Sequence, residues 1–209
     1  MRWRSGRQFL FAAISTVVLL SPATAFAEAV GRTSALVPSA TQQQGGSGPA
    51  ALNLNDSVMR NAVLETAKGG ALEVTFADNS KLSMGEASEA VIDEFTYAGP
   101  ATASSQSLKM TKGLFRFVSG AVQKDKVKLE TPAVTIGIRG TVLRVKSPGD
   151  GTTTVGVDDD GTHPPDMVLA IVISKATGQK VELTPGHYVT FGQDGLPGDI
   201  QQGTVPGCN

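Results

Sequence analysis

The sequence predicts an all-β fold: a rolled antiparallel sheet, a sandwich or a short β-solenoid of many short strands. Two observations support this prediction. From Leu72 to Phe191, short runs alternate apolar and polar residues at the period of two that is typical of half-buried strands. Turn-forming groups of Gly, Asn, Asp, Ser and Pro separate these runs at regular spacing, and few segments show helical periodicity.

The first 27 residues are predicted to be a secretory signal peptide. Three arginines among the first seven residues form a basic start, the apolar run Phe9–Leu20 follows, and Ala25-Phe26-Ala27 is a small-x-small cleavage site. The apolar run is shorter than the about 20 residues that a membrane span needs. We therefore expect cleavage after Ala27, export, and no stable membrane span in the mature chain.

The composition of the mature chain limits the classes of partner that it can bind and the disulfides that it can form. Removing 27 of 209 residues leaves 182, and removing three arginines leaves 15 basic against 19 acidic residues, a formal charge of −4. Such a chain lacks the basic surface that nucleic-acid binding requires, so we expect no nucleic-acid partner. Cys208 is the only cysteine, which excludes an internal disulfide. We interpret it as a free thiol in a frayed tail, with an intermolecular disulfide as the alternative.

Four segments divide the chain in order. Residues 1–27 are the signal peptide, and residues 28–54 are predicted to hold an edge strand and a flexible loop. Residues 55–191 are expected to form one β domain, and residues 192–209, rich in Gly, Pro and Gln, a loose tail.

The edge strand is expected within Ala29–Val37 and the loop at Gln42–Pro49, which is polar and glycine-rich. Within residues 56–68, Asp56 could cap a helix that Gly69 and Gly70 would end, or the same residues could form short strands.

From residue 72 onward each predicted element is a strand. A hairpin turns at Asp78-Asn79-Ser80, because these residues have turn chemistry and apolar alternation flanks them. Met167–Ile173 is apolar at every position, which favours a strand covered on both faces. The other strands are expected near residues 90–97, 108–110, 115–117, 127–129, 134–145, 152–157, 181–183 and 189–191.

The stretch from Lys128 to Val145 is the most distinctive of the chain. Arg139 stands alone in an otherwise uncharged strand, and glycines at positions 137 and 140 flank it. Arg139 could bind a carboxylate or carbonyl of a partner. We favour a structural role instead, in which a partly buried Arg139 bonds to carbonyl oxygens or pairs with an acid such as Asp78, Asp93 or Glu94. This interpretation predicts that Arg139→Ala lowers the melting temperature by several degrees.

No arrangement of residues predicts catalysis, a metal or a cofactor. Asp158-Asp159-Asp160-Gly161 lacks the spaced oxygen ligands of a calcium loop, and the two histidines, His163 and His187, have no metal-ligand spacing. No serine lies in a Gly-x-Ser-x-Gly motif. One loose positive stretch is interpreted as a solvated strand face, with binding of an anionic polysaccharide as the alternative; it contains Lys109, Lys112, Arg116, Lys124, Lys126 and Lys128.

The order of these motifs resembles the FecR-domain family of bacterial envelope proteins. The resemblance is carried by Asn55–Val58, Leu64–Thr66, the hairpin Leu72–Gly85 and Ile92–Tyr97, and most strongly by Lys112–Gly120 and Thr131–Thr141. It implies an all-β domain, which favours strands over a helix at residues 58–66. It also implies a motif with a mainly structural role, made of Thr131, Pro132, Gly137, Arg139, Gly140 and Thr141.

The resemblance also indicates a function. Family members named for the ferric-citrate regulator are membrane proteins that sense a loaded outer-membrane transporter and control a sigma factor through a cytoplasmic N-terminus. Here only the expected signal peptide precedes the domain, so we expect no sigma-factor segment. We expect a non-catalytic, periplasmic signalling module that binds an envelope protein. The alternative is a structural or adhesive module at the cell surface or secreted, which could bind polysaccharide.

Overall fold

The all-β prediction is confirmed. The structure is a computed structural model, and it describes residues 28–99 and 104–208, so the expected signal peptide lies outside the described residues. Within them nearly every regular element is a strand, apart from the 3-10 turn η1 (Lys124–Lys126). No helix in this part of the chain is long and apolar enough to cross a membrane.

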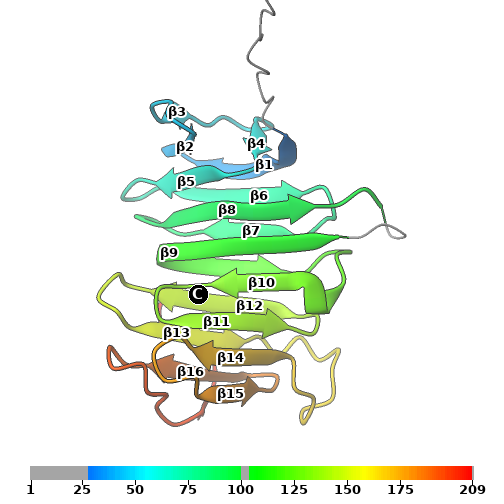
Figure 1. Ribbon diagram of the computed structural model, residues 1–209, viewed down its shortest axis with the longest axis vertical. Coiled ribbons are helices and arrows are strands. Elements are labelled where there is room, and N and C mark those ends of the chain that lie inside the picture. Colours follow the sequence, from blue (N-terminus) through cyan, green and yellow to red (C-terminus); the bar gives the residue numbers. More distant parts are fainter. Residues whose placement is uncertain (1–27, 100–103, 209) are drawn as a thin grey trace, which may run out of the picture.

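The 17 described strands form one mixed sheet that folds into two layers without closing into a barrel (Figure 1). Layer A contains, in spatial order, β4 (Ser57–Met59), β1 (Ala29–Val37), β6 (Ala71–Phe76), β7 (Lys81–Met84), the second half of β9 (Ser105–Val118), β12 (Val142–Ser147), β13 (Thr153–Val157), β16 (His187–Phe191) and β17 (Gln201–Gln202). Layer B contains β3 (Ala50–Ala51), β2 (Ala40–Gln44), β5 (Ala62–Thr66), β8 (Glu89–Thr96), the first half of β9, β10 (Val127–Glu130), β11 (Val134–Ile138), β14 (Ala170–Ser174) and β15 (Lys180–Leu183).

Strand β9 joins the two layers. Its first half pairs antiparallel with β8 and parallel with β10 in layer B, and its second half pairs antiparallel with β7 and β12 in layer A. Gly113, where the strand passes from one layer to the other, has a φ of +118°, a conformation that L side chains rarely adopt. The sequence predicts separate strands on either side of this glycine, whereas the structure has a single strand of 14 residues.

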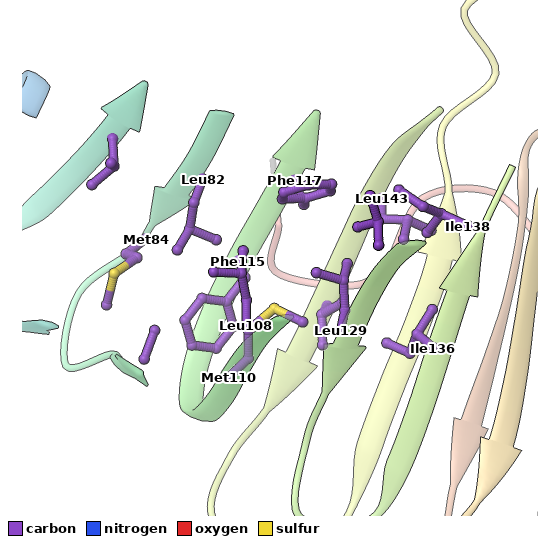
Figure 2. Close-up of a cluster of buried hydrophobic side chains, with 14 of the residues drawn as sticks. Leu82, Met84, Leu108, Met110, Phe115, Phe117, Leu129, Ile136, Ile138 and Leu143 are labelled. Carbon is purple, nitrogen blue, oxygen red and sulfur yellow. The ribbon is translucent and has the colours of Figure 1, made fainter. Parts of the chain in front are cut away.

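The core lies between the layers. Alternate residues of each strand point inward, as in β6, where Leu72, Val74 and Phe76 are buried and the residues between them are only partly so. Figure 2 shows the centre of this core, to which layer A contributes Leu82, Met84, Phe115, Phe117 and Leu143, and layer B contributes Leu108, Met110, Leu129, Ile136 and Ile138. Every one of these ten side chains is at most 3% exposed, so both layers depend on one apolar core.

Two local predictions are confirmed. The hairpin of β6 and β7 turns at Asn79, whose φ of +64° lies in the left-handed region that asparagine tolerates. Residues 57–66 form strands β4 and β5 and no helix, as the family resemblance implies.

Three expectations need correction. Gln42 and Gln44 belong to strand β2 and not to a flexible loop, because β2 pairs with β5 and both side chains hydrogen-bond to the backbone of residues 59–60. Only part of Met167–Ile173 is covered on both faces: β14 begins at Ala170, and both Met167 and Ile173 are 40% exposed.

The third correction concerns the tail after Gly192, which is packed against the sheet and is not loose. Strand β17 pairs with β16, Val205 is 1% exposed and Cys208 is 8% exposed. This packing also explains why all five residues of β13 are buried: one face lies on the core, and the C-terminal segment covers the other.

Candidate functional site

The signature residues Thr131 and Pro132 form the tight turn between β10 and β11. Thr131 is buried, its Oγ1 accepts a hydrogen bond from the Val134 amide at 3.1 Å, and it lies 3.0 Å from Thr153 Oγ1 in layer A. Pro132 is exposed. Thr131 therefore ties a turn of layer B to layer A, which is a structural role.

Glu130, next to this turn, is held by two lysines. Its carboxylate lies 2.5 Å from Lys128 Nζ and 2.7 Å from Lys175 Nζ, and its side chain is 13% exposed. The hydrogen bonds from Lys128 and then Lys175 lower the pKa of Glu130 from 4.5 to about 2.

A lowered carboxyl pKa makes folding stability depend on pH. The stabilisation is fully present above about pH 4.5 and disappears as the pH falls to about 2. We expect Glu130→Gln to lower the free energy of unfolding at pH 7 by about 1–2 kcal/mol, since solvent screens the lysine head groups. Urea unfolding between pH 7 and pH 2 should show the two proteins converging below pH 4.5. A difference that does not depend on pH would contradict this prediction.

The remaining uncharged signature residues differ in how far the backbone constrains them. Gly140 has a φ of +97°, and an added Cβ would lie 3.1 Å from Lys124 Cε. Thr141 is 5% exposed. Gly137, in contrast, lies on the exposed face of β11, and an added Cβ would meet no atom within 4 Å. Glycine is therefore required at position 140, and Gly137 has no such local requirement.

Arg139 is exposed, so the interpretation as a buried structural clamp is wrong. Strand β11 ends at Ile138, and the backbone amide of Arg139 donates to Leu169 O at 2.8 Å while the side chain turns outward. In the described residues, the guanidinium makes no hydrogen bond or ion pair. Asp78, Asp93 and Glu94, its proposed partners, are all bonded elsewhere.

We therefore expect Arg139→Ala to leave the melting temperature within about 1 °C of the wild type, as is usual for exposed positions without partners. Differential scanning calorimetry checks this. A loss of several degrees would restore the structural role that the sequence alone suggested.

The positive stretch of the sequence does not form one basic surface. Lys109 pairs with Asp93 at 2.6 Å, Lys128 pairs with Glu130, and Lys126 pairs with Asp125 at 3.3 Å. Lys109 and Lys128 lie on layer B, whereas Arg116 lies on layer A. Some of these basic side chains are paired with acids, and they are distributed over both layers. They therefore form no continuous basic surface, which removes the main support for polysaccharide binding.

The other acids and histidines lie in local turns or pairs. Asp159 and Asp160 accept hydrogen bonds from the amides of residues 161 and 162, at 3.0 and 2.9 Å. His163 Nδ1 lies 2.8 Å from Thr162 Oγ1 in the same exposed turn, and His187 Nδ1 lies 2.8 Å from the Pro185 carbonyl oxygen. Among the residues that the structure describes, no group of three or more His, Cys, Asp or Glu could hold a metal ion.

A surface hollow lies on the outer face of layer A, where sequence reasoning identified no site. Its volume is about 470 Å³, and Arg116, Arg144, Asp158 and Thr204 are among its lining residues. A second hollow, of about 230 Å³, shares the two arginines and is otherwise lined by uncharged residues, including Met84, Leu114 and Cys208. We call the two hollows together the arginine groove.

The two arginines of the groove differ in their partners. Arg144 Nε donates to Asp158 Oδ1 at 2.7 Å, and its Nη1 donates to the carbonyl oxygen of Cys208. Arg116, its register partner on β9, is half-buried and makes no hydrogen bond or ion pair within the described residues. The larger hollow therefore holds the Arg144–Asp158 ion pair, Arg116 without a directly bonded acid among the described residues, and the carboxylates of Asp159 and Asp160.

Cys208 lies beside these arginines. Burial raises the pKa of its thiol, although the nearby Arg144 and Lys146 lower it. The thiol therefore stays protonated at neutral pH and is a poor nucleophile. Sequence reasoning missed this site because its residues come from six separate segments of the chain, and the fold brings them together.

Comparisons with known proteins agree with this fold. Residues 62–159, from β5 through β13, match the family model described as FecR protein. Two crystal structures of a "putative anti-sigma factor" from Parabacteroides distasonis are similar, with 14% and 12% sequence identity and TM-scores of 0.50 and 0.49. Each match covers 68% of this chain and only 59% of the other. At 14% identity, the first match shows a likeness of fold alone. No curated protein matches the chain.

Proposed function

We propose that this chain, which carries a FecR domain at residues 62–159, is an exported regulatory module that acts in the cell envelope by binding a protein partner. The proposal rests on the match to the FecR family model, because the matched residues 62–159 include the central strands of both layers. They also include Arg116 and Arg144 of the groove. The basic, apolar and small-residue pattern of residues 1–27 supports export to the periplasm.

The chemistry of the arginine groove supports binding without catalysis. An arginine stays protonated in proteins, so it can hold an anionic group but cannot act as a general base at neutral pH. The one thiol nearby is kept protonated by burial. Half-buried guanidinium groups at the edge of a hollow are common contacts at protein interfaces, where arginine is enriched.

Photo-crosslinking in the native host tests this function. A photoreactive amino acid at Val142, which lines the groove, should form a discrete adduct with one envelope protein, and the chain should be released with the periplasmic fraction. The same amino acid at Ile173, an exposed position on layer B, is the matched control and should form no such adduct. Deletion of the gene should change transcription of a small set of genes. Retention in the cytoplasm, or adducts from neither position, would contradict the proposal.

A further inference from the structure

Among the described residues Arg116 makes no hydrogen bond or ion pair, and the strand register helps to explain why. The outer row of layer A runs from Glu73 through Ser83, Arg116 and Arg144 to Gly156. Like charges directly opposite each other on neighbouring strands repel, so two adjacent arginines need compensation. Asp158 supplies it to Arg144 alone.

No other acid of this row is available to Arg116. The Glu73 carboxylate is already hydrogen-bonded to Ser34 at 2.9 Å, Ser83 at 3.3 Å and Lys81 at 3.3 Å. Asp159 and Asp160, which also line the larger hollow, accept the amide hydrogen bonds of their own turns and make no ion pair with Arg116. Within residues 28–99 and 104–208 no acid bonds the half-buried guanidinium of Arg116, so it can bind an anion from outside the chain.

The smaller hollow next to Arg116 defines what else that ligand carries. Uncharged side chains and backbone line it, among them Met84, Gly85, Leu114 and Phe115, and no acid does. A volume of about 230 Å³ accommodates one apolar side chain. An apolar group beside a carboxylate is the chemistry of a protein segment in which an acidic residue neighbours a Leu, Val or Ile.

The C-terminal segment lines part of this site, with Thr204 at the larger hollow and Cys208 at the smaller one. Val205 packs into the notch at Gly156, where an added Cβ would lie 2.6 Å from Val205 Cγ2. The Cys208 amide donates to the Val205 carbonyl at 3.1 Å, and this turn places the Cys208 carbonyl on Arg144. Release of Val205 would free one edge of the Arg144 guanidinium for the same ligand.

We infer that the arginine groove is a docking site for a short acidic and apolar segment of a partner protein, with the carboxylate on Arg116, an apolar side chain in the smaller hollow and the chain's own C-terminal turn as a partial cover. This inference rests on the proposed function and adds the chemistry of the partner.

An NMR titration of the mature full-length chain tests the inference. The probes are the hexapeptide Gly-Leu-Asp-Leu-Asp-Gly and its neutral counterpart with Asn in place of Asp. The acidic peptide should shift the resonances of residues in β7, β9 and β12, and should bind at least about fivefold more tightly than the neutral one, as expected for one charge-assisted contact. Arg116→Ala should remove this preference. Arg139→Ala, which removes an equally unpaired arginine outside the groove, should retain it.

A second arm tests the cover. Val205→Asp should release the C-terminal turn and tighten binding of the acidic peptide several-fold, because the open form becomes more populated. Val205→Ala, a milder change, should give a smaller effect in the same direction, and circular dichroism checks that both variants fold. Equal affinity for the two peptides, shifts outside layer A, or perturbation by alginate alone would overturn the inference. A failed titration together with successful crosslinking from Val142 would leave the proposed function intact and contradict only the ligand chemistry.

Discussion

Gly113→Ala is expected to lower the free energy of unfolding by about 3 kcal/mol or more, because it combines backbone strain with a collision that cannot relax. Gly113 has a φ of +118°, and an added Cβ would lie 2.0 Å from Ser88 Oγ and 2.6 Å from Ser88 Cα. The second contact is to backbone, so a change of the Ser88 rotamer cannot relieve it. For a domain of this size the melting temperature should fall by about 6–12 °C.

The effect is large because of where Gly113 lies. It is the point at which β9 leaves layer B for layer A, and Ser88 Oγ accepts the hydrogen bond of the next amide, Leu114, at 3.1 Å. Displacing Ser88 therefore disturbs both layers. Thermal and urea unfolding measure the loss.

Gly137→Ala is the matched control for this experiment. An added Cβ there meets nothing within 4 Å and the φ is not positive, so the free energy of unfolding should change by less than about 0.5 kcal/mol. Similar stability losses for the two variants would show that the bend in β9 has no special role.

The bend at Gly113 shows which parts of the fold cannot be predicted from the sequence. The hairpin of β6 and β7 could be predicted, because its apolar alternation and its turn residues Asp78-Asn79-Ser80 are local features. The continuity of β9 could not, because the bend at Gly113 is shaped around Ser88, which precedes it by 25 residues and lies just before strand β8. The sequence pattern at Lys112-Gly113 is the same for a strand end and for a bend.

The candidate site was hidden for a related reason. Arg139 attracts attention as a lone charge in an apolar strand, yet β11 ends one residue earlier and the side chain faces solvent. Arg116 is inconspicuous among several lysines, but strand register places it opposite Arg144. The C-terminal segment has a composition typical of a loose tail, and its position depends on a notch at Gly156 that no local pattern reveals.

Asp78→Ala is expected to have the second large effect, a loss of about 3–5 kcal/mol, because it removes a fully buried carboxylate and leaves its donors without acceptors. Asp78 is 0% exposed. Its Oδ1 accepts hydrogen bonds from the Ser80 amide at 3.0 Å and from Ser80 Oγ at 2.5 Å, and its Oδ2 accepts one from the Val122 amide at 3.1 Å.

The surroundings allow no substitute partner for these donors. An added Cβ at Gly120 would lie 2.5 Å from Asp78 Oδ2, so the loop that follows β9 is packed directly against the carboxylate. Gln106 Nε2 donates to Ser80 Oγ at 3.0 Å, which extends the network into layer B. Water cannot reach such a site without opening the contact between the β6–β7 turn and residues 120–122.

Three variants separate the contributions to this network. Asp78→Asn keeps the shape but turns one acceptor into a donor, and should cost about 1–3 kcal/mol. Ser80→Ala should cost less than Asp78→Ala, and the double variant should lose less than the sum, because the two side chains share one hydrogen bond. Asp125→Ala, at a side chain that is 71% exposed, is the control and should change stability by less than about 0.5 kcal/mol. Additive losses for residues 78 and 80 would show that they act independently, and the buried carboxylate would then not be what joins the turn to the loop after β9.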